Sequence, residues 1–363
     1  MPVEFIGFVG NHNSSEIIPR KGPILDGTYI EAVAKAHEFG GFDRVLTAFH
    51  SSTPDALQVS QHILAVTKTL GTLIAQRPGF TAPTVLARQF ATLHELYGQR
   101  VSFNVITGGD HAELVHDGNT VADKDERYVR TSEALDIIRA EWTAEKPFDY
   151  HGRFYQVEGG FSAIKPSTPI DIFIAGASDA AIEVAGRHAD VFALWGETYE
   201  QVRGQIARVR AAAAQNGRAA PRISLSLRPI LAETEDSAWA RAEDILATAR
   251  RLAPQTGFGT NAGPPNEGSR RLLAAAALGT RLDKRLWTAL SQFTGAKGNS
   301  TSLVGTPDQV AEAMLDYYDL GVDIFLIRGF DPLADTVAYG RDLLPRVHAL
   351  VAERDRLGGR RAA

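Results

Sequence analysis

The feature that most constrains the fold is an alternation of two patterns that runs along the whole chain. Short apolar runs, rich in β-branched and aromatic residues, are each followed by a longer segment of helical period. The strands are predicted at 3–10, 44–49, 71–75, 101–107, 170–175, 191–195, 223–231 and 323–328. Eight strands, each with a following helix, predict an α/β fold of the (β/α)8 TIM barrel type.

Two stretches are longer than this alternation requires. After the helix predicted at 126–142, residues 148–157 have the pattern of a β-hairpin that turns at His151 and Gly152. Between 254 and 300, glycines and prolines interrupt the helical pattern. We therefore predict a single barrel domain over 1–363, with insertions after strands four and seven.

A doubly wound open sheet is the competing architecture. Its dinucleotide-binding version carries G-x-G-x-x-G after the first strand. Here the first predicted strand ends with Gly10, Asn11, His12 and Asn13, and no Walker A motif occurs in the chain. These observations favour the barrel.

Composition excludes several classes of function. The chain has no Cys, which excludes a disulfide framework, a thiolate zinc site and a cysteine nucleophile. Lys and Arg total 38 against 43 Asp and Glu, a net charge of −5, and no basic stripe points to nucleic acid. No apolar run approaches the ~20 residues that cross a bilayer, and residues 1–10 do not resemble a secretory signal. We expect a soluble, cytoplasmic protein without a nucleic-acid or membrane partner.

In a barrel, the active site lies at the carboxyl ends of the strands. The predicted strand ends carry three arginines (Arg77, Arg228 and Arg328) and two histidines (His12 and His50), but few carboxylates. Paired acids for glycoside hydrolysis and a cluster of metal ligands are both poorly supported. The residues instead predict a pocket for an anion and a flat ring, with no metal.

One loop is especially informative. Residues 176–180 (GASDA) follow a predicted strand and open a helix, so free backbone N–H groups and the helix dipole favour a phosphate there. The alternative is that Ser178 only caps the helix. At the start of the helix predicted at 126–142, Asp125 is the expected N-cap, which does not by itself single out Tyr128.

Arg228 lies in an otherwise apolar strand, and an arginine buried there needs an anionic partner. That partner is either a neighbouring Asp or Glu or an anionic substrate, which guanidinium binds through two parallel hydrogen bonds. For His12 the alternative to a site role is a local hydrogen bond within its loop.

Six segments carry a resemblance to a known family. They are RPGFTAPTVLARQ (77–89), RVSFNVITGGD (100–110), DERY (125–128), GASDA (176–180), LWGE (194–197) and LVG (303–305). With them the chain resembles the bacterial-luciferase-like flavin-dependent monooxygenases, and among these the alkanesulfonate monooxygenases, from about residue 3 to 350.

The resemblance implies a barrel that uses reduced FMN (FMNH2), supplied by a separate NAD(P)H-dependent flavin reductase. It implies a cis peptide bond between Ala75 and Gln76, and a mobile lid over 254–300. The cofactor-binding residues carried over from it are Ala75, Gln76, Asn104, Thr107, Tyr128, Gly176, Ala177, Ser178 and Trp195.

The substrate side departs further from the family. The Cys that the family has after strand two is missing, and Phe330 stands where the family has a Tyr. The family's Arg and His on strand seven are replaced by Leu227 and Pro229, with Arg228 between them. The expected catalytic residues are Arg228, His12 and Trp195. The expected substrate-binding residues are Arg228, Arg328, Lys297, His50, Asn11 and Phe330.

The implied activity is the O2-dependent desulfonation of an organosulfonate, either an alkanesulfonate or a sulfosugar such as sulfoquinovose, to sulfite and an aldehyde. Two alternatives stay open: an F420-dependent oxidoreductase of the same barrel superfamily, and a non-catalytic flavin- or sulfonate-binding barrel. We expect a transient complex with the reductase. We also expect a homodimer or homotetramer that packs through the apolar faces of helices 55–70 and 84–96.

Overall fold

A computed structural model of the chain describes residues 3–108, 111–259, 266–296, 298 and 301–358. Eight parallel strands close into a barrel in the order β1-β14-β9-β8-β7-β4-β3-β2, which confirms the predicted fold class. The barrel strands are β1 (Glu4–Phe8), β2 (Arg44–Thr47), β3 (Gly71–Gln76), β4 (Val101–Val105), β7 (Ile172–Ala175), β8 (Val191–Trp195), β9 (Arg222–Leu227) and β14 (Ile324–Ile327).

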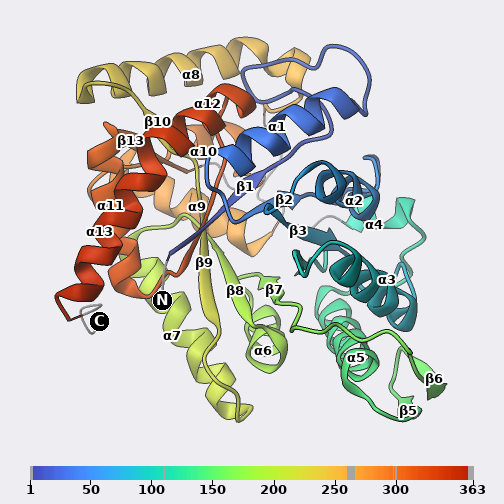
Figure 1. The fold of residues 1–363 in the computed structure, drawn as a ribbon. Helices are drawn as coiled ribbons and strands as arrows, with labels where there is room; N and C mark the ends of the chain where they lie inside the picture. Colours follow the sequence, from blue (N-terminus) through green and yellow to red (C-terminus); the bar gives the residue numbers. More distant parts are fainter. Residues whose placement is uncertain (1–2, 109–110, 260–265, 297, 299–300, 359–363) are drawn as a thin grey trace. The chain divides into compact units, whose positions relative to one another are not determined.

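Helices follow the strands along the chain, as Figure 1 shows by its colours and labels. They are α1 (Gly27–Phe39), α2 (Ala56–Val66), α3 (Pro83–Leu96), α5 (Lys124–Thr143), α6 (Asp179–His188), α7 (Tyr199–Gln215), α8 (Glu235–Thr256), α11 (Pro307–Leu320), α12 (Pro332–Ala338) and α13 (Leu344–Arg356). Asp123, not the expected Asp125, caps α5, since its side chain accepts from the backbone N–H of Glu126. Thr306 caps α11 in a reciprocal pair with Gln309.

The insertion after β4 contains the short helix α4 (His111–His116), which the sequence did not predict. The hairpin after α5 is confirmed as β5 (Phe148–His151) and β6 (Gln156–Gly160), paired antiparallel. The hairpin is tied to α5, because the Glu133 carboxylate accepts the backbone N–H groups of Arg153, Phe154 and Tyr155.

The insertion after β9 forms a second small sheet that the sequence did not predict. Its strands are β10 (Ile230–Leu231), β11 (Arg281–Leu282), β12 (Leu286–Trp287) and β13 (Ser302–Gly305), in the order β10-β13-β12-β11. Helices α9 (Glu267–Leu278) and α10 (Ala289–Thr294) connect them. The strand predicted over 223–231 therefore ends at Leu227. Pro229 has no N–H for a ladder, and the chain pairs again only at Ile230, opposite Val304.

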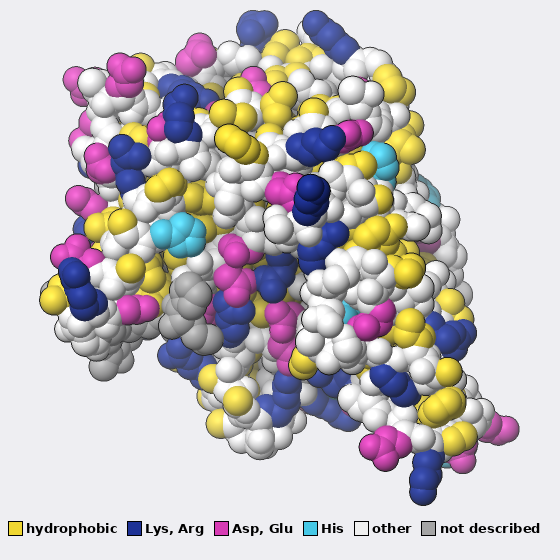
Figure 2. All heavy atoms as spheres, viewed as in Figure 1, with side chains coloured by type: hydrophobic (Ala, Val, Ile, Leu, Met, Phe, Trp, Pro, Cys, Tyr) yellow, Lys and Arg dark blue, Asp and Glu magenta, His cyan; other side chains and the backbone are white. Residues whose placement is uncertain are grey.

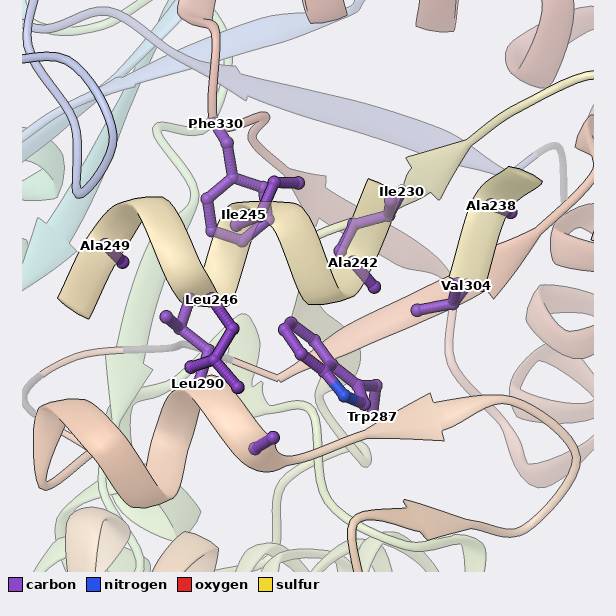
Figure 3. Close-up of a cluster of buried hydrophobic side chains, with 11 residues drawn as sticks. Ile230, Ala238, Ala242, Ile245, Leu246, Ala249, Trp287, Leu290, Val304 and Phe330 are labelled. Atoms are coloured by element: carbon purple, nitrogen blue, oxygen red, sulfur yellow. The ribbon is translucent and has the colours of Figure 1, made fainter. Parts of the chain in front are cut away.

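Apolar side chains from α8, β10, β12, β13 and α10 form one core beneath this sheet. Figure 3 shows Trp287 and Leu290 facing α8, with the Phe330 ring beside Ile245. Trp287 and Leu290 are fully buried. This core holds Phe330, the residue that the sequence placed in the substrate site.

The helical segment after β14 is interrupted. A π-helical turn (Tyr339–Leu343) separates α12 from α13, and the Tyr339 hydroxyl donates to the Pro229 carbonyl at 2.5 Å. A Cβ on Gly340 would lie 2.4 Å from Cα of Gly40, so the two backbones touch and leave no room for a side chain.

The chain divides into two compact units. Unit 1 comprises Met1–Leu46, Ala193–Arg208 and Arg222–Ala363, and unit 2 comprises Thr47–Phe192 and Val209–Pro221. Each unit is described by itself below. The single domain over 1–363 stays a prediction, as does the lid over 254–300, which lies in unit 1 and is described only in part.

The surface expected to form an oligomer is used inside the chain. In unit 2, α2 packs against β3 and buries Ile63 and Leu64, while α3 packs against α5 and buries Leu86 and Phe90. Val85 and Leu96 of α3 remain exposed. The homodimer or homotetramer stays a prediction.

On the face drawn in Figure 2, Lys and Arg side chains alternate with Asp, Glu and apolar side chains. No large area of one sign covers that face. Among the described helices, none is long and apolar enough to cross a bilayer.

Two buried histidines are held neutral. In unit 1, burial lowers the pKa of His37 to about 4, although its Nδ1 hydrogen-bonds to the Val33 carbonyl. The ring fills the space beside Gly7 of β1, where a Cβ would lie 2.0 Å from Cδ2 of the ring. In unit 2, burial lowers the pKa of His188 to about 3.

We expect acid to destabilise the fold through these groups. The folded pKa of His37 lies below its ordinary value of 6.5, so the unfolded chain takes up a proton first as the pH falls. Its contribution is complete above about pH 6.5 and is lost toward pH 4, an effect of about 3 kcal/mol. Urea unfolding at a series of pH values measures it. His37→Gln should flatten the pH dependence in that window, and an unchanged slope would contradict the assignment.

Candidate functional site

Three hydroxyl groups and a glycine meet at the start of α6 in unit 2. The Tyr128 hydroxyl is hydrogen-bonded to the side chains of Thr107 and Ser178. Gly176 has a φ of 141°, and a Cβ there would lie 2.9 Å from the Tyr128 hydroxyl and 2.6 Å from Cβ of Ala181. We call Thr107, Tyr128, Gly176 and Ser178 the hydroxyl cradle.

Of the two alternatives left open for Ser178, the structure shows the helix cap, and the phosphate role stays a prediction. Its Oγ accepts from the backbone N–H of Ala181 at 3.3 Å and so caps α6, as the capping alternative requires. The same side chain also contacts Tyr128. Burial raises the pKa of Tyr128, which keeps the phenol neutral and able to donate. Hydroxyl donors at a helix N-terminus, on a backbone without Cβ, are the chemistry that fits a phosphate.

The other residues expected to bind the cofactor lie on neighbouring strands of unit 2. Ala75 of β3 pairs with Asn104 of β4, and Gln76 pairs with Val105. Ala75 and Gln76 are buried, and Asn104 is half-buried. The prediction of a cis peptide bond between Ala75 and Gln76 was wrong. In the described residues every peptide bond is trans, including this one. The trans form is the one that non-prolyl bonds favour by about 3–4 kcal/mol.

A second charged cluster in unit 2 surrounds the end of β3. Nη2 of the buried Arg77 lies 2.8 Å from each carboxylate oxygen of Glu113, on α4. The guanidinium also lies 5.1 Å from the centre of the Phe49 ring. Nε2 of His50 lies 3.5 Å from Glu113, and the His50 side chain is about half exposed. Burial alone would raise the pKa of Glu113, but the hydrogen bonds from Arg77 and Ser51 lower it.

In unit 1, Arg228 makes a bidentate ion pair that the sequence did not identify. Its Nη1 and Nη2 donate to the two oxygens of Glu16 at 2.7 and 2.9 Å, and Nη2 also donates to the Gly329 carbonyl at 3.0 Å. The Phe330 ring covers one face, 3.6 Å from Cζ. Arg228 and Glu16 are almost completely buried. Of the two partners left open for Arg228, the structure contains the carboxylate; its substrate role stays a prediction.

Arg328 completes this cluster. Its Nη2 lies 4.0 Å from Glu16, and its side chain is 30% exposed. Partial burial and the neighbouring Arg228 lower the pKa of Arg328 to about 10. Burial opposes ionisation of Glu16, but the two arginines outweigh it and lower its pKa to about 2. Both guanidinium groups thus lie within ion-pair distance of the Glu16 carboxylate.

The remaining residues of unit 1 have local partners. Nδ1 of His12 hydrogen-bonds to the Ile24 carbonyl at 3.0 Å. This is the local hydrogen bond that we gave as the alternative to a role in the site. The Asn11 carbonyl accepts from the N–H of Asp26, the cap of α1. Trp195 is half-buried, with its ring against Gly268. Lys297 lies outside the described residues.

Sequence reasoning missed the acidic partners at these strand ends. Besides Glu16 and Glu113, the buried Glu197 after β8 forms an ion pair with Arg271 of α9. No local pattern links such pairs: Arg228 and Glu16 are 212 positions apart. The expected cofactor residues all fall in unit 2 except Trp195, and the expected substrate residues all fall in unit 1 except His50.

Several solved structures resemble the chain in fold. Riboflavin lyase (RcaE), solved with modified FMN and riboflavin, matches with a TM-score of 0.79 and 19% identity, over 100% of this chain and 94% of that one. EDTA monooxygenase (EmoA) from Chelativorans sp. BNC1 matches with a TM-score of 0.76 and 19% identity, over 99% of each chain. An F420-dependent secondary alcohol dehydrogenase matches with a TM-score of 0.67 and 17% identity, over 96% and 99%.

At these identities the structures show a shared fold, and the sequence itself shows the family. The family model described as luciferase-like monooxygenase matches residues 3–324, which is most of the chain. The eight-stranded barrel agrees with that match. The chain therefore belongs to the bacterial luciferase-like monooxygenase family.

Proposed function

We propose that this chain is the oxygenase component of a two-component system that uses reduced FMN and O2 to desulfonate an organosulfonate. The products would be sulfite and an aldehyde. The observation that carries the proposal is the hydroxyl cradle, because its donors at the N-terminus of α6 fit a phosphate monoester. When bound, the reduced flavin supplies the electrons and activates O2.

In this proposal the residues of unit 2 bind and orient. Thr107, Tyr128 and Ser178 donate hydrogen bonds to the phosphate, and Gly176 lets the backbone pack directly against the Tyr128 hydroxyl and Ala181, where a Cβ would clash. Gln76 and Asn104, on paired strands, contact the ring system, as the family resemblance implies.

In unit 1, the cluster of Glu16, Arg228 and Arg328 supports an anionic substrate. Arg328 lies at the partly exposed edge of this cluster, and a guanidinium can bind a sulfonate through charge-assisted hydrogen bonds. The terminal nitrogens of Arg228 already donate to Glu16 and Gly329. We therefore assign substrate contact to the partly exposed Arg328 and a positioning role to Arg228.

The second candidate is an F420-dependent oxidoreductase, which the likeness to the F420-dependent alcohol dehydrogenase supports at the level of fold. A phosphate-binding cradle does not by itself distinguish the two cofactors. A third candidate, a barrel that binds flavin or sulfonate without catalysis, would bind FMN and release no sulfite.

Cofactor titration and sulfite release separate these candidates. We expect anaerobic titration to give tighter binding of reduced FMN than of reduced F420 or oxidised FMN. With a flavin reductase, NAD(P)H and O2, we expect sulfite from at least one member of a panel of alkyl and sugar sulfonates. Preference for F420, or FMN binding without sulfite from any sulfonate, would overturn the proposal.

Tyr128→Phe tests the cradle. Removing one hydroxyl donor to a charged group should weaken FMN binding by roughly tenfold to a hundredfold, because such hydrogen bonds contribute roughly 1.5–3 kcal/mol. The matched control is Tyr150→Phe, because that hydroxyl contacts Asp136 instead. Fluorescence titration of both variants measures the effect. Equal FMN affinities in the two variants would show that the Tyr128 hydroxyl does not contact the cofactor.

The Glu16–Arg228 pair tests the positioning role. Arg228→Met leaves the Glu16 carboxylate buried without its partner, which should lower the free energy of unfolding by about 3–5 kcal/mol. The double variant Glu16→Gln/Arg228→Met should recover most of that loss, as urea unfolding will measure. A double variant that is no more stable than Arg228→Met would show that the unpaired Glu16 carboxylate is not the cause of the loss.

Arg328→Met tests the substrate contact. We expect a well-folded protein with KM for the sulfonate raised by about tenfold or more, since charged hydrogen bonds to a ligand are worth roughly 2 kcal/mol or more. Steady-state kinetics on the variant supply the measurement. An unchanged KM would show that Arg328 does not touch the substrate.

A further inference from the structure

Helix α5 begins with two buried arginines, one on each side of Tyr128 in the sequence. The exposed fraction is 3% for Arg127 and 8% for Arg130. Within the ranges that the structure describes, neither guanidinium lies within ion-pair distance of a carboxylate. Buried arginines normally have such a partner, because an uncompensated charge is costly to remove from water.

The partners that these arginines do have are neutral. Arg127 donates to the carbonyls of Val121 and Ala122, with Gly108 at the limit of hydrogen-bond distance at 3.5 Å. Arg130 donates from Nη2 to the Asn119 side-chain oxygen at 3.0 Å. In the described part of the chain, Nε of each arginine is buried without a hydrogen-bond partner. Neutral oxygens satisfy N–H groups but do not cancel the charge.

Arg127 lies close to the hydroxyl cradle, and Arg130 acts on Arg127 from the next turn of α5. Arg127 interacts electrostatically with the Tyr128 hydroxyl, which is hydrogen-bonded to Thr107 and Ser178. Gly108, the carbonyl neighbour of Arg127, directly follows Thr107. Arg127 and Arg130 also repel each other, and burial lowers the pKa of both. The other titratable groups that act on them are Asp123 on Arg127 and Tyr155 on Arg130.

We propose that Arg127 and Arg130 form a charged platform behind the cradle that selects a phosphate monoester dianion, and hence FMN over the unphosphorylated riboflavin. This inference rests on the proposed function for its ligand. Among the described residues, Asp123 acts on Arg127 without forming an ion pair, and a dianion in the cradle would supply further compensating charge. The arginines act through the field at the cradle, so they are positioning residues for the cofactor.

The platform makes a specific prediction about two ligands that differ only in the phosphate. Arg130→Gln removes a charge but leaves a donor for Asn119, and Arg130→Met removes both. We expect either variant to raise the Kd of FMN by roughly tenfold to a hundredfold, from the Coulomb interaction at an effective dielectric constant near 20. The Kd of riboflavin should change by less than about twofold, since it presents no charge to the platform.

Three further variants make the test specific. Arg130→Lys and Arg127→Lys keep the charge and should retain most of the preference for FMN. Arg139→Met, on the same helix, removes an arginine that is paired with Asp190 and should not change the preference. Fluorescence titration under anaerobic conditions with reduced ligands, or in air with oxidised ones, gives the ratio of the two Kd values. Thermal melting without ligand shows which variants fold.

The outcomes are distinguishable. Equal weakening of FMN and riboflavin in a folded Arg130→Gln or Arg130→Met variant would make Arg130 purely structural and overturn the platform. An unchanged FMN affinity would overturn it as well, while the proposed function would stand. If neither neutral variant folds, the Arg127→Lys variant decides. A folded Arg127→Lys protein with the wild-type preference for FMN over riboflavin supports the platform. Loss of that preference in Arg127→Lys overturns the platform. Wild-type protein that binds neither flavin would overturn the proposed function and the platform together.

Discussion

Strands of a parallel barrel are buried on both faces, so the chain can carry polar chemistry only where each ladder ends. In β3 every residue is buried, and the first charged side chain is Arg77, directly after the last paired residue. Arg228 follows β9 and Arg328 follows β14 in the same way. Each of these positions must balance its charge inside the protein or with a ligand.

The chain balances the charge of its buried arginines in two different ways. Arg77 and Arg228 are balanced by Glu113 and Glu16, which come from loops far away in the sequence. Arg127 and Arg130 are buried and, in the described part of the chain, donate hydrogen bonds only to neutral oxygens. This contrast separates guanidinium groups that hold the fold together from those whose balance we attribute to a bound anion.

Much of the fold was predictable because its signals are local. Strand β8 has the bounds that periodicity predicted, and Ser178 caps α6, which was one of the two alternatives for it. The two-residue strands β10, β11 and β12 are too short for a periodic pattern, so the second sheet was missed. Asp125 was predicted as the N-cap of α5 in place of Asp123 for a similar reason. Several acidic residues lie at the start of this helix, and the sequence does not show which of them has the backbone conformation of a cap.

The candidate site divides along the same line. Thr107, Tyr128, Gly176 and Ser178 each lie in short motifs, and the structure brings all four together. Glu16 gave no local signal, because its meaning depends on a partner 212 positions later. The arginines beside Tyr128 were visible in the sequence, but only their burial without carboxylates makes them informative.

The central claim is that the hydroxyl cradle holds a phosphate dianion beside two buried positive charges. Phosphorus-31 NMR of FMN bound to the protein tests it directly, because the resonance of a free phosphate monoester shifts as its second proton dissociates near pH 6. The account predicts a bound resonance that stays at the dianion position from about pH 5 to 8, since the platform lowers the phosphate pKa. A bound resonance that titrates like free FMN would show that the phosphate remains in water, and would contradict the account.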